Sequence, residues 1–348
     1  MDEKRLDYLD MVKGIGIALV VIGHSPGVSD HILIWITSFH MPLFFIVSGI
    51  LFAYKRSDRE LFVTYAKSRF CSTMIPYFCF SLINIIVDWG RYMRAPEAVG
   101  WGVVQTDIMQ SLSLFGVSVL WFLPSLFLGG LCLYGIVKKC PVWLRCVIGV
   151  ASAVLSTIGA RLVLTFIPMG KNIFFAWLGS LLIALLRAFP ALAFMLMGYG
   201  TYFLLQKLRW KTVWEVLLGA GCLGINAAAA FANAGVDLHY LMLNNVLLYY
   251  LGAGSATFGL ILICRHIKPF RLPVFLGKNS LIIMVTHLDC RVMRAAIIFA
   301  EGMNRLIPGA VMFRVSLYLA LLLGELAMIL LINRFGFFLI GRRKPVKI

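Results

Sequence analysis

The sequence predicts an all-α, polytopic integral membrane protein with about ten transmembrane helices and with its N- and C-termini in the cytoplasm. Hydrophobic residues occupy 61% of the 348 positions and charged residues only 14%, whereas a soluble domain is about 45–50% apolar and about 25% charged. Several apolar runs also reach the roughly 20 residues that a helix needs to cross a bilayer. Positive charges gather in short clusters between these runs.

The apolar runs account for nearly the whole chain. We expect spans near residues 12–27, 32–54, 70–90, 113–137, 142–164, 182–205, 212–233, 240–264, 274–298 and 311–335. No long polar linker and no strong internal repeat divides them, which argues against a transporter built from two halves. We therefore expect residues 1–348 to form a single membrane-embedded domain.

The basic residues define an orientation. With a cytoplasmic N-terminus, 21 of the 32 Lys and Arg residues fall in inside segments and 4 in outside segments, as the positive-inside rule requires. The net charge of +17 thus matches loops beside anionic lipid, and no nucleic-acid partner is expected.

Eight cysteines, which form no C-x-x-C pair, mostly lie in apolar runs. They are interpreted as small buried hydrophobic residues, and their spacing predicts no metal site. The N-terminal M-D-E-K-R has no small-residue cleavage site, so a cleaved signal peptide is not expected.

The first span carries the most informative charges. Lys13 and His24 are 11 residues apart, which on one helix means about 16 Å and about 20° from alignment. A phosphate anchor and a general base would need such a spread, because both can then face one cavity at different depths. The alternative, given about equal weight, is that Lys13 reaches to the interface and His24 only ends the span. Asp10 could position Lys13.

In the second span, His40 precedes Pro42. Proline breaks the helical hydrogen-bond ladder, and irregular backbone at membrane depth occurs mainly where it lines a cavity or is buried in protein. His40 could therefore face the same cavity as His24. A loop histidine at the outer interface explains the pattern equally well.

Four further residues are candidates. On physics alone, Arg69 is more simply an ordinary inside charge and Trp121 an interfacial aromatic residue. Asn279 and His287 lie eight residues apart, about 80° from alignment, so that both can face the bundle interior. The glycines of G-I-G-I-A-L do not form a nucleotide-binding loop, and no G-x-S-x-G elbow is present.

These segments resemble a known family. The N-terminal R-L-D-Y-L-D-M-V-K-G-I-G-I-A-L-V-V-I-G-H and the following F-H-M-P-L-F-F-I-V-S-G resemble the acyltransferase 3 family of bacterial membrane proteins, most closely its fucose 4-O-acetylase-related branch. The family signature, a basic residue, ten residues and a histidine, corresponds to Lys13 and His24. The likeness extends to the segments around Arg69 and Trp121 and to L-G-K-N-S-L-I-I-M-V-T-H, but no motif is placed between about 140 and 265.

The resemblance implies an enzyme that moves an acyl group, usually acetyl, from a coenzyme A thioester to a hydroxyl. The acceptor would be a sugar of a surface polysaccharide or its lipid-linked precursor, at the bacterial inner membrane. Acetyl-CoA would be a donor substrate, with no tightly bound cofactor. His24 would be the base and His40 would orient it or the acceptor, with Lys13 and Arg69 on the coenzyme A phosphates. Asp10, Trp121, Asn279 and His287 would contact substrate. The competing class is a multi-pass transporter of glycans or small solutes.

Overall fold

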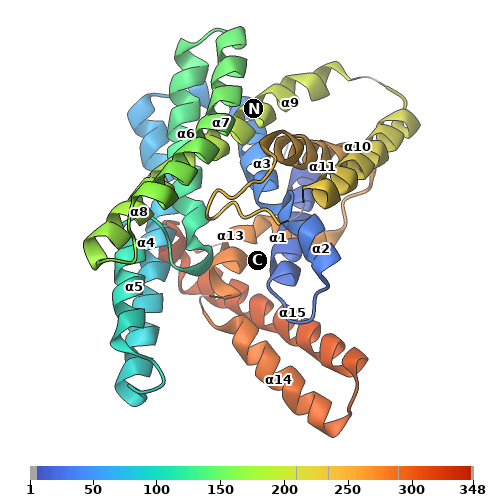
Figure 1. Ribbon diagram of the computed structural model, residues 1–348. Helices are drawn as coiled ribbons and strands as arrows, with labels where there is room; N and C mark the ends of the chain where they lie inside the picture. Colours follow the sequence, from blue (N-terminus) through green and yellow to red (C-terminus); the bar gives the residue numbers. More distant parts are fainter. Residues whose placement is uncertain (1–5, 209, 234, 289, 346–348) are drawn as a thin grey trace. The chain divides into compact units, whose positions relative to one another are not determined.

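The computed structural model describes residues 6–208, 210–233, 235–288 and 290–345, and these form helices joined by loops (Figure 1). No β-strand occurs in this part of the chain, where the extended backbone makes only an isolated bridge between Asp237 and Met242. The prediction of an all-α membrane protein is confirmed.

The long and short helices follow one another along the whole chain. They are α1 (Asp7–Gly23), α2 (Asp30–Thr37), α3 (His40–Tyr54), η1 (Ser57–Arg59), α4 (Phe62–Arg94), α5 (Trp101–Leu112), η2 (Ser118–Trp121), α6 (Phe122–Lys139), α7 (Val142–Phe166), α8 (Ile173–Leu186), α9 (Ala188–Lys207), α10 (Thr212–Ala232), α11 (Val246–His266), α12 (Arg271–Lys278), α13 (Ser280–Thr286), α14 (Val292–Leu306), α15 (Ala310–Arg334) and η3 (Phe337–Ile340).

Among the described residues, 8 helical segments are long and apolar enough to cross a membrane. They coincide with the expected second to eighth and tenth spans. The expected first span is α1, which has 17 residues. The expected ninth span is not one helix, because the chain there is divided among α12, α13 and α14. Which side of the membrane holds the termini stays a prediction.

The predicted irregularity near Pro42 is present. The chain leaves helical geometry between α2 and α3 at Phe39, which has a φ of −147° and a ψ of −16°, and Pro42 lies in the first turn of α3. Proline is tolerated there because the first-turn N–H groups have no partner within the helix. This break decides where His40 lies, at the first residue of α3.

The chain divides into two compact units. The first takes in residues 1–69 and 125–278, and the second residues 70–124 and 279–348. The two units alternate along the sequence. The boundary between them falls once within α4 and once within α6. The single-domain expectation itself stays a prediction.

In the first unit, helices pack closely at glycines. A Cβ on Gly49 of α3 would lie 2.0 Å from the carbonyl oxygen of Met195, and one on Gly198 of α9 would lie 2.0 Å from that of Ile46. Small residues that let two backbones approach are typical of helix pairs in membranes. The α3–α9 pair is therefore fixed by two reciprocal glycine contacts.

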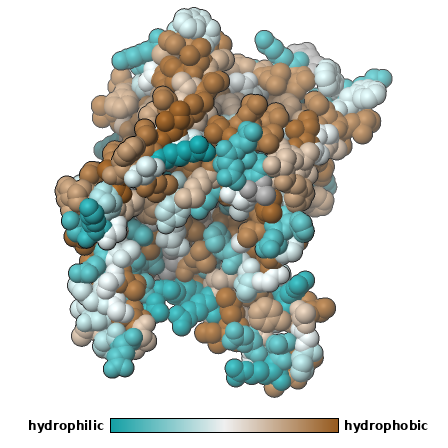
Figure 2. All heavy atoms as spheres, viewed as in Figure 1, coloured by the Kyte–Doolittle hydropathy of each residue, from teal (hydrophilic) through white to brown (hydrophobic). Residues whose placement is uncertain are grey.

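The outer surface of α7 presents apolar side chains. Val142, Trp143, Val147 and Val150 are all more than half exposed, and Figure 2 shows brown, hydrophobic side chains gathered over α7 and α8. In water such a surface would be unfavourable, so it is assigned to contact with lipid.

The second unit contains the greater part of α4 together with α5, η2, α13, α14, α15 and η3. Helices α14 and α15 form an antiparallel hairpin (Figure 1). They approach closely where Gly324 faces the side chain of Val292.

Candidate active site

Helix α1 carries the two residues of the family signature. It begins at Asp7 and ends at Gly23, and His24 follows as its C-terminal cap. Lys13 and His24 therefore belong to one continuous helical path, as predicted, with about 16 Å between their turns. The side chain of His24 is exposed, whereas that of Lys13 is half-buried.

Lys13 is already paired. Its Nζ lies 2.7 Å from Oδ1 of Asp10, one turn earlier, and the Asp10 side chain is buried. A second ammonium lies at the same end of the helix, since Nζ of Lys278 is 3.6 Å from Oδ1 of Asp7. The N-terminal end of α1 thus collects two lysines and two aspartates. The expectation that Asp10 contacts Lys13 agrees with this geometry.

The position of Lys278 follows from the packing of α12 against α1. A Cβ on Gly277 would lie 1.8 Å from the carbonyl oxygen of Asp10, and a Cβ on Gly14 would lie 1.8 Å from that of Pro273. Only glycine allows the two backbones to approach this closely at both points. The glycines of the first span therefore serve helix packing.

His24 and His40 have the same local arrangement. Nδ1 of His24 lies 2.8 Å from the carbonyl oxygen of Val20, and Nδ1 of His40 lies 2.8 Å from that of Ile36. A carbonyl oxygen only accepts hydrogen bonds, so each Nδ1 carries the proton and donates it. Each Nε2 is then left with a lone pair, which is the form a general base needs.

The α2–α3 break that holds His40 is anchored from α10. Ser38 Oγ donates to the carbonyl oxygen of Trp35 at 2.7 Å and accepts from Nδ2 of Asn226 at 2.9 Å. Asn226 also donates to the carbonyl oxygen of Gly252 in α11 at 3.1 Å and is fully buried. Asn226 of α10 therefore connects the end of α2 with α11. Its contact at the end of α2, Ser38, lies two residues before His40.

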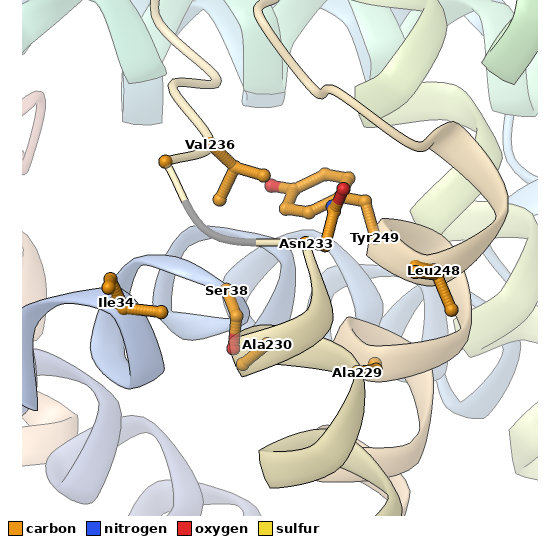
Figure 3. A pocket seen from close by; sticks show the side chains of 10 residues that line it. Ile34, Ser38, Ala229, Ala230, Asn233, Val236, Leu248 and Tyr249 are labelled. Atoms are coloured by element: carbon orange, nitrogen blue, oxygen red, sulfur yellow. The ribbon is translucent and has the colours of Figure 1, made fainter. Parts of the chain in front are cut away.

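A small cavity of about 10 Å³ lies beside this anchor. Figure 3 shows its lining side chains, with Ser38 from the end of α2, Asn233 from the end of α10 and Tyr249 from α11. The cavity is about as large as one water molecule requires. It is too small for a substrate, so it belongs to the support of the α2–α3 break.

Arg69 lies in an aromatic environment in the first unit. Its guanidinium is 5.5 Å from the centre of the Tyr65 ring, and Tyr65 stacks on Tyr134 with ring centres 5.1 Å apart. Lys138 lies over Tyr134 and donates to its hydroxyl at 2.8 Å. Arg69 and Lys138 thus flank a stacked pair of tyrosines.

The other three predicted site residues belong to the second unit. Trp121 is buried in η2, where its backbone packs against Gly116. Asn279 accepts at Oδ1 from Nδ2 of Asn333 at 3.0 Å, and Asn333 in turn accepts from Arg342.

His287 is fully buried, with Nδ1 2.9 Å from the carbonyl oxygen of Ile283. Each of these three residues has a place in the interior of the second unit, and their role toward substrate stays a prediction.

Two residues of the site were not singled out by sequence reasoning. Lys278 lies in the L-G-K-N-S segment, where the sequence shows it only as one of many basic residues expected on the inside. Asn226 lies in the region without a motif, and the one signal for it is an amide in the apolar run 212–233. An amide in a membrane helix normally finds a partner on a neighbouring helix.

No group of three or more His, Cys, Asp and Glu residues in the described part of the chain is arranged to hold a metal ion. Beside the carboxylates of Asp7 and Asp10, the site offers imidazoles, ammonium groups and a guanidinium. Such groups bind anions and transfer protons.

Comparison with known proteins identifies the family. The model of the acyltransferase 3 family, described as an acyltransferase domain, matches residues 6–337. No curated protein and no solved structure matches the chain. The matched segment contains α1 with its lysine and histidine, the α2–α3 break and every other predicted site residue. The chain is therefore a multi-pass membrane protein that belongs to the acyltransferase 3 family.

Proposed function

We propose that the protein is an O-acyltransferase of the bacterial cytoplasmic membrane that transfers an acyl group, acetyl in the simplest case, from a coenzyme A thioester to a sugar hydroxyl. The sugar belongs to a cell-surface polysaccharide or to its lipid-linked precursor. The observation that carries the proposal is the hydrogen bond from His24 Nδ1 to Val20, which leaves Nε2 as a proton acceptor on an exposed side chain.

The chemistry follows from this tautomer. Nε2 of His24 takes the proton from the acceptor hydroxyl, and the oxygen attacks the thioester carbonyl carbon. The C–S bond breaks, an oxygen ester forms, and the coenzyme A thiolate takes the proton from the imidazolium. His24 caps the C-terminal end of α1, where the helix dipole stabilises a positive charge. The imidazolium formed during the reaction is thereby favoured. His40 orients His24 or the acceptor.

Coenzyme A phosphates are assigned to the opposite end of α1. Lys13 and Lys278 supply two ammonium groups there, and ammonium groups bind phosphate as compact point charges. Arg69 adds a guanidinium that can bind a phosphate through two hydrogen bonds. The expected topology places these three cations on the cytoplasmic side, where acyl-coenzyme A is found.

The first experiment measures release of free coenzyme A from acetyl-CoA by purified protein in detergent, with a panel of sugars and lipid-linked glycans. We expect release that requires an acceptor and that falls by about 10²–10⁴ in His24→Ala. His24→Asn restores a donor to the Val20 carbonyl but no base, so it is expected to be equally inactive. His31→Ala, which changes an exposed histidine of α2, is the matched control and is expected to keep full activity.

Full activity of His24→Ala would overturn the assignment of the base. Acetyl-CoA that remains intact with every acceptor, with transport of a glycan into vesicles, would instead identify a transporter.

A further inference from the structure

In the second unit, one face of the membrane helix α4 is polar. Tyr77, Ser81, Asn84 and Asp88 follow one another at intervals of three and four residues, and all four are buried. Their helical positions fall within an arc of about 60° and extend over about 16 Å. Four polar residues in line on a membrane-spanning helix mark a functional surface, because polar groups are costly inside a bilayer.

Charged residues gather at the end of this face. Oδ1 of Asp88 lies 2.6 Å from NH1 of Arg91 and 2.6 Å from NH2 of Arg291. The carboxyl of Asp107, from α5, is close enough to Asp88 to share a hydrogen bond. A hydrogen bond between them needs a proton on one of the two carboxyl groups. Two carboxyl groups and two guanidinium groups thus gather at this end of the face.

Several polar atoms along this face have no hydrogen-bond partner in the described chain. They are Oγ of Ser81, Nδ2 of Asn84, Oδ2 of Asp107 and Nε of Arg291. Ser81 and Asn84 are each only 3% exposed, and an unsatisfied buried polar group costs about 1–3 kcal/mol. Such groups therefore point to a ligand or to ordered water.

Ser81 differs from three other helical serines. Ser48, Ser111 and Ser316 each donate to the carbonyl oxygen one turn earlier, at 2.6–2.7 Å. The hydroxyl of Ser81 makes no such bond. It is thus available to a partner that the chain does not provide.

The backbone and the aromatic residues add to the pattern. Arg291 has a φ of 60°, a left-handed conformation that costs free energy in a residue other than glycine, and from this position its guanidinium reaches Asp88. Trp89 and Trp101 are 51% and 44% exposed, and Tyr92 contacts Trp101 with ring centres 5.6 Å apart. Exposed aromatic rings therefore accompany the charged cluster.

We infer that this group of largely buried side chains, named the α4 polar strip and formed by Ser81, Asn84, Asp88, Arg91, Asp107 and Arg291, binds the hydroxyl-rich glycan that accepts the acyl group. Carboxylate oxygens accept hydrogen bonds from sugar hydroxyls, and amide and guanidinium N–H groups donate to them. The mixture of donors and acceptors along one line suits a chain of hydroxyls. A phosphate, which offers acceptors only, would leave the two carboxyl groups unused. The inference deepens the proposed function and rests on it.

The strip also assigns a membrane side to the acceptor. Helix α4 begins at the end that carries Arg69, expected inside, and ends at Arg91 and Arg94, expected outside. The charged end of the strip is thus on the expected outer side, and the α1 end with Lys13 is on the expected cytoplasmic side. With this expected topology, the inference puts the acceptor at the outer membrane face.

The test measures sugar binding without any thioester, so that no turnover occurs. Purified protein is titrated with the methyl glycosides of fucose, rhamnose, glucose, galactose and N-acetylglucosamine, by calorimetry in detergent. We expect at least one of them to bind, and Asn84→Ala and Asp107→Asn each to weaken it at least tenfold. Leu82→Ala changes a neighbouring side chain of α4 that is 56% exposed and is the matched control, expected to bind as the wild type does. All variants are first required to give a monodisperse elution profile.

Two results overturn the inference. In the first, Asn84→Ala and Asp107→Asn bind the glycosides as tightly as the wild type does. In the second, the wild type binds none of the five glycosides, which would mean that ordered water satisfies the polar atoms of the strip. Coenzyme A release, measured on the same preparations, reports separately on the proposed function. A third result is coenzyme A release that depends on His24 while both strip variants bind glycosides as the wild type does. That result would support the proposed acyltransferase activity and contradict only the inference about the α4 polar strip.

Discussion

Nζ of Lys13 lies 2.7 Å from Oδ1 of Asp10, so the cation marked as a phosphate anchor is held by a buried anion of its own helix. The pair fixes the ammonium in place, and a phosphate that binds there has to share Lys13 with Asp10. The ion pair gives Lys13 a part in stability beside its proposed part in donor binding, and variants can separate the two.

Lys13→Met is expected to lower the free energy of unfolding by about 2 kcal/mol, because it leaves the Asp10 carboxylate buried without its counter-ion. The double variant Lys13→Met/Asp10→Asn removes both charges and is expected to recover most of that stability. Its KM for acetyl-CoA is expected to stay raised, since the phosphate anchor is still absent. Thermal unfolding and steady-state kinetics measure the two effects, and a normal KM in the double variant would reduce Lys13 to a structural role.

Asn226→Ala is expected to lower kcat more than it changes KM for acetyl-CoA. The substitution removes the hydrogen bonds to Ser38 and to the Gly252 carbonyl and thereby loosens the α2–α3 break next to His40. If Asn226 acts through His40, the losses of kcat in Asn226→Ala and His40→Ala will not add in the double variant. Additive losses would show that the two residues act independently.

Gly277→Ala is expected to disrupt the contact of α12 with α1, because the new Cβ would lie 1.8 Å from the Asp10 carbonyl oxygen. The displacement reaches Lys13 and Lys278 together, so protein yield and acetyl-CoA binding are both expected to fall. Gly135→Ala in α6 is the matched control, since nothing lies within 4 Å of its Cβ position. There alanine is expected to be neutral or to stabilise by up to about 1 kcal/mol.

Asp107 makes stability depend on pH. Burial, followed by the neighbouring Asp88 carboxylate, raises the pKa of Asp107 to about 6, while Arg291 acts in the opposite direction. Helix α5, which carries Asp107, is outside the candidate membrane spans.

A raised folded-state pKa means that the folded protein binds the proton more tightly than the unfolded chain. The stabilising contribution, of the order of 3 kcal/mol, is thus complete below about pH 4 and is lost as the pH rises through 6. Thermal unfolding of the wild type is expected to weaken over this window relative to Asp107→Asn, which cannot titrate. Parallel curves for the two proteins between pH 4 and 7 would contradict the shared proton.

The sequence by itself determined the membrane architecture and the first half of the site. Apolar runs of about 20 residues have to become helices in a bilayer, because the backbone has no other way to satisfy its hydrogen bonds there. For that reason the long spans coincide with the helices found, and the spacing of Lys13 and His24 follows from helical geometry alone. Pro42 likewise predicted the α2–α3 break, since its ring restricts the backbone locally.

Contacts between distant segments were decided only by the tertiary structure. The expected ninth span is divided into α12, α13 and α14. Asn226 meets Ser38 across 188 residues, and Arg291 meets Asp88 across 203. Hydrogen bonds and ion pairs of this kind depend on which helices become neighbours, and helix neighbours in a bilayer are selected by close packing at positions such as Gly14 and Gly277. The periodicity and charge pattern of the sequence do not predict which helices pack against one another.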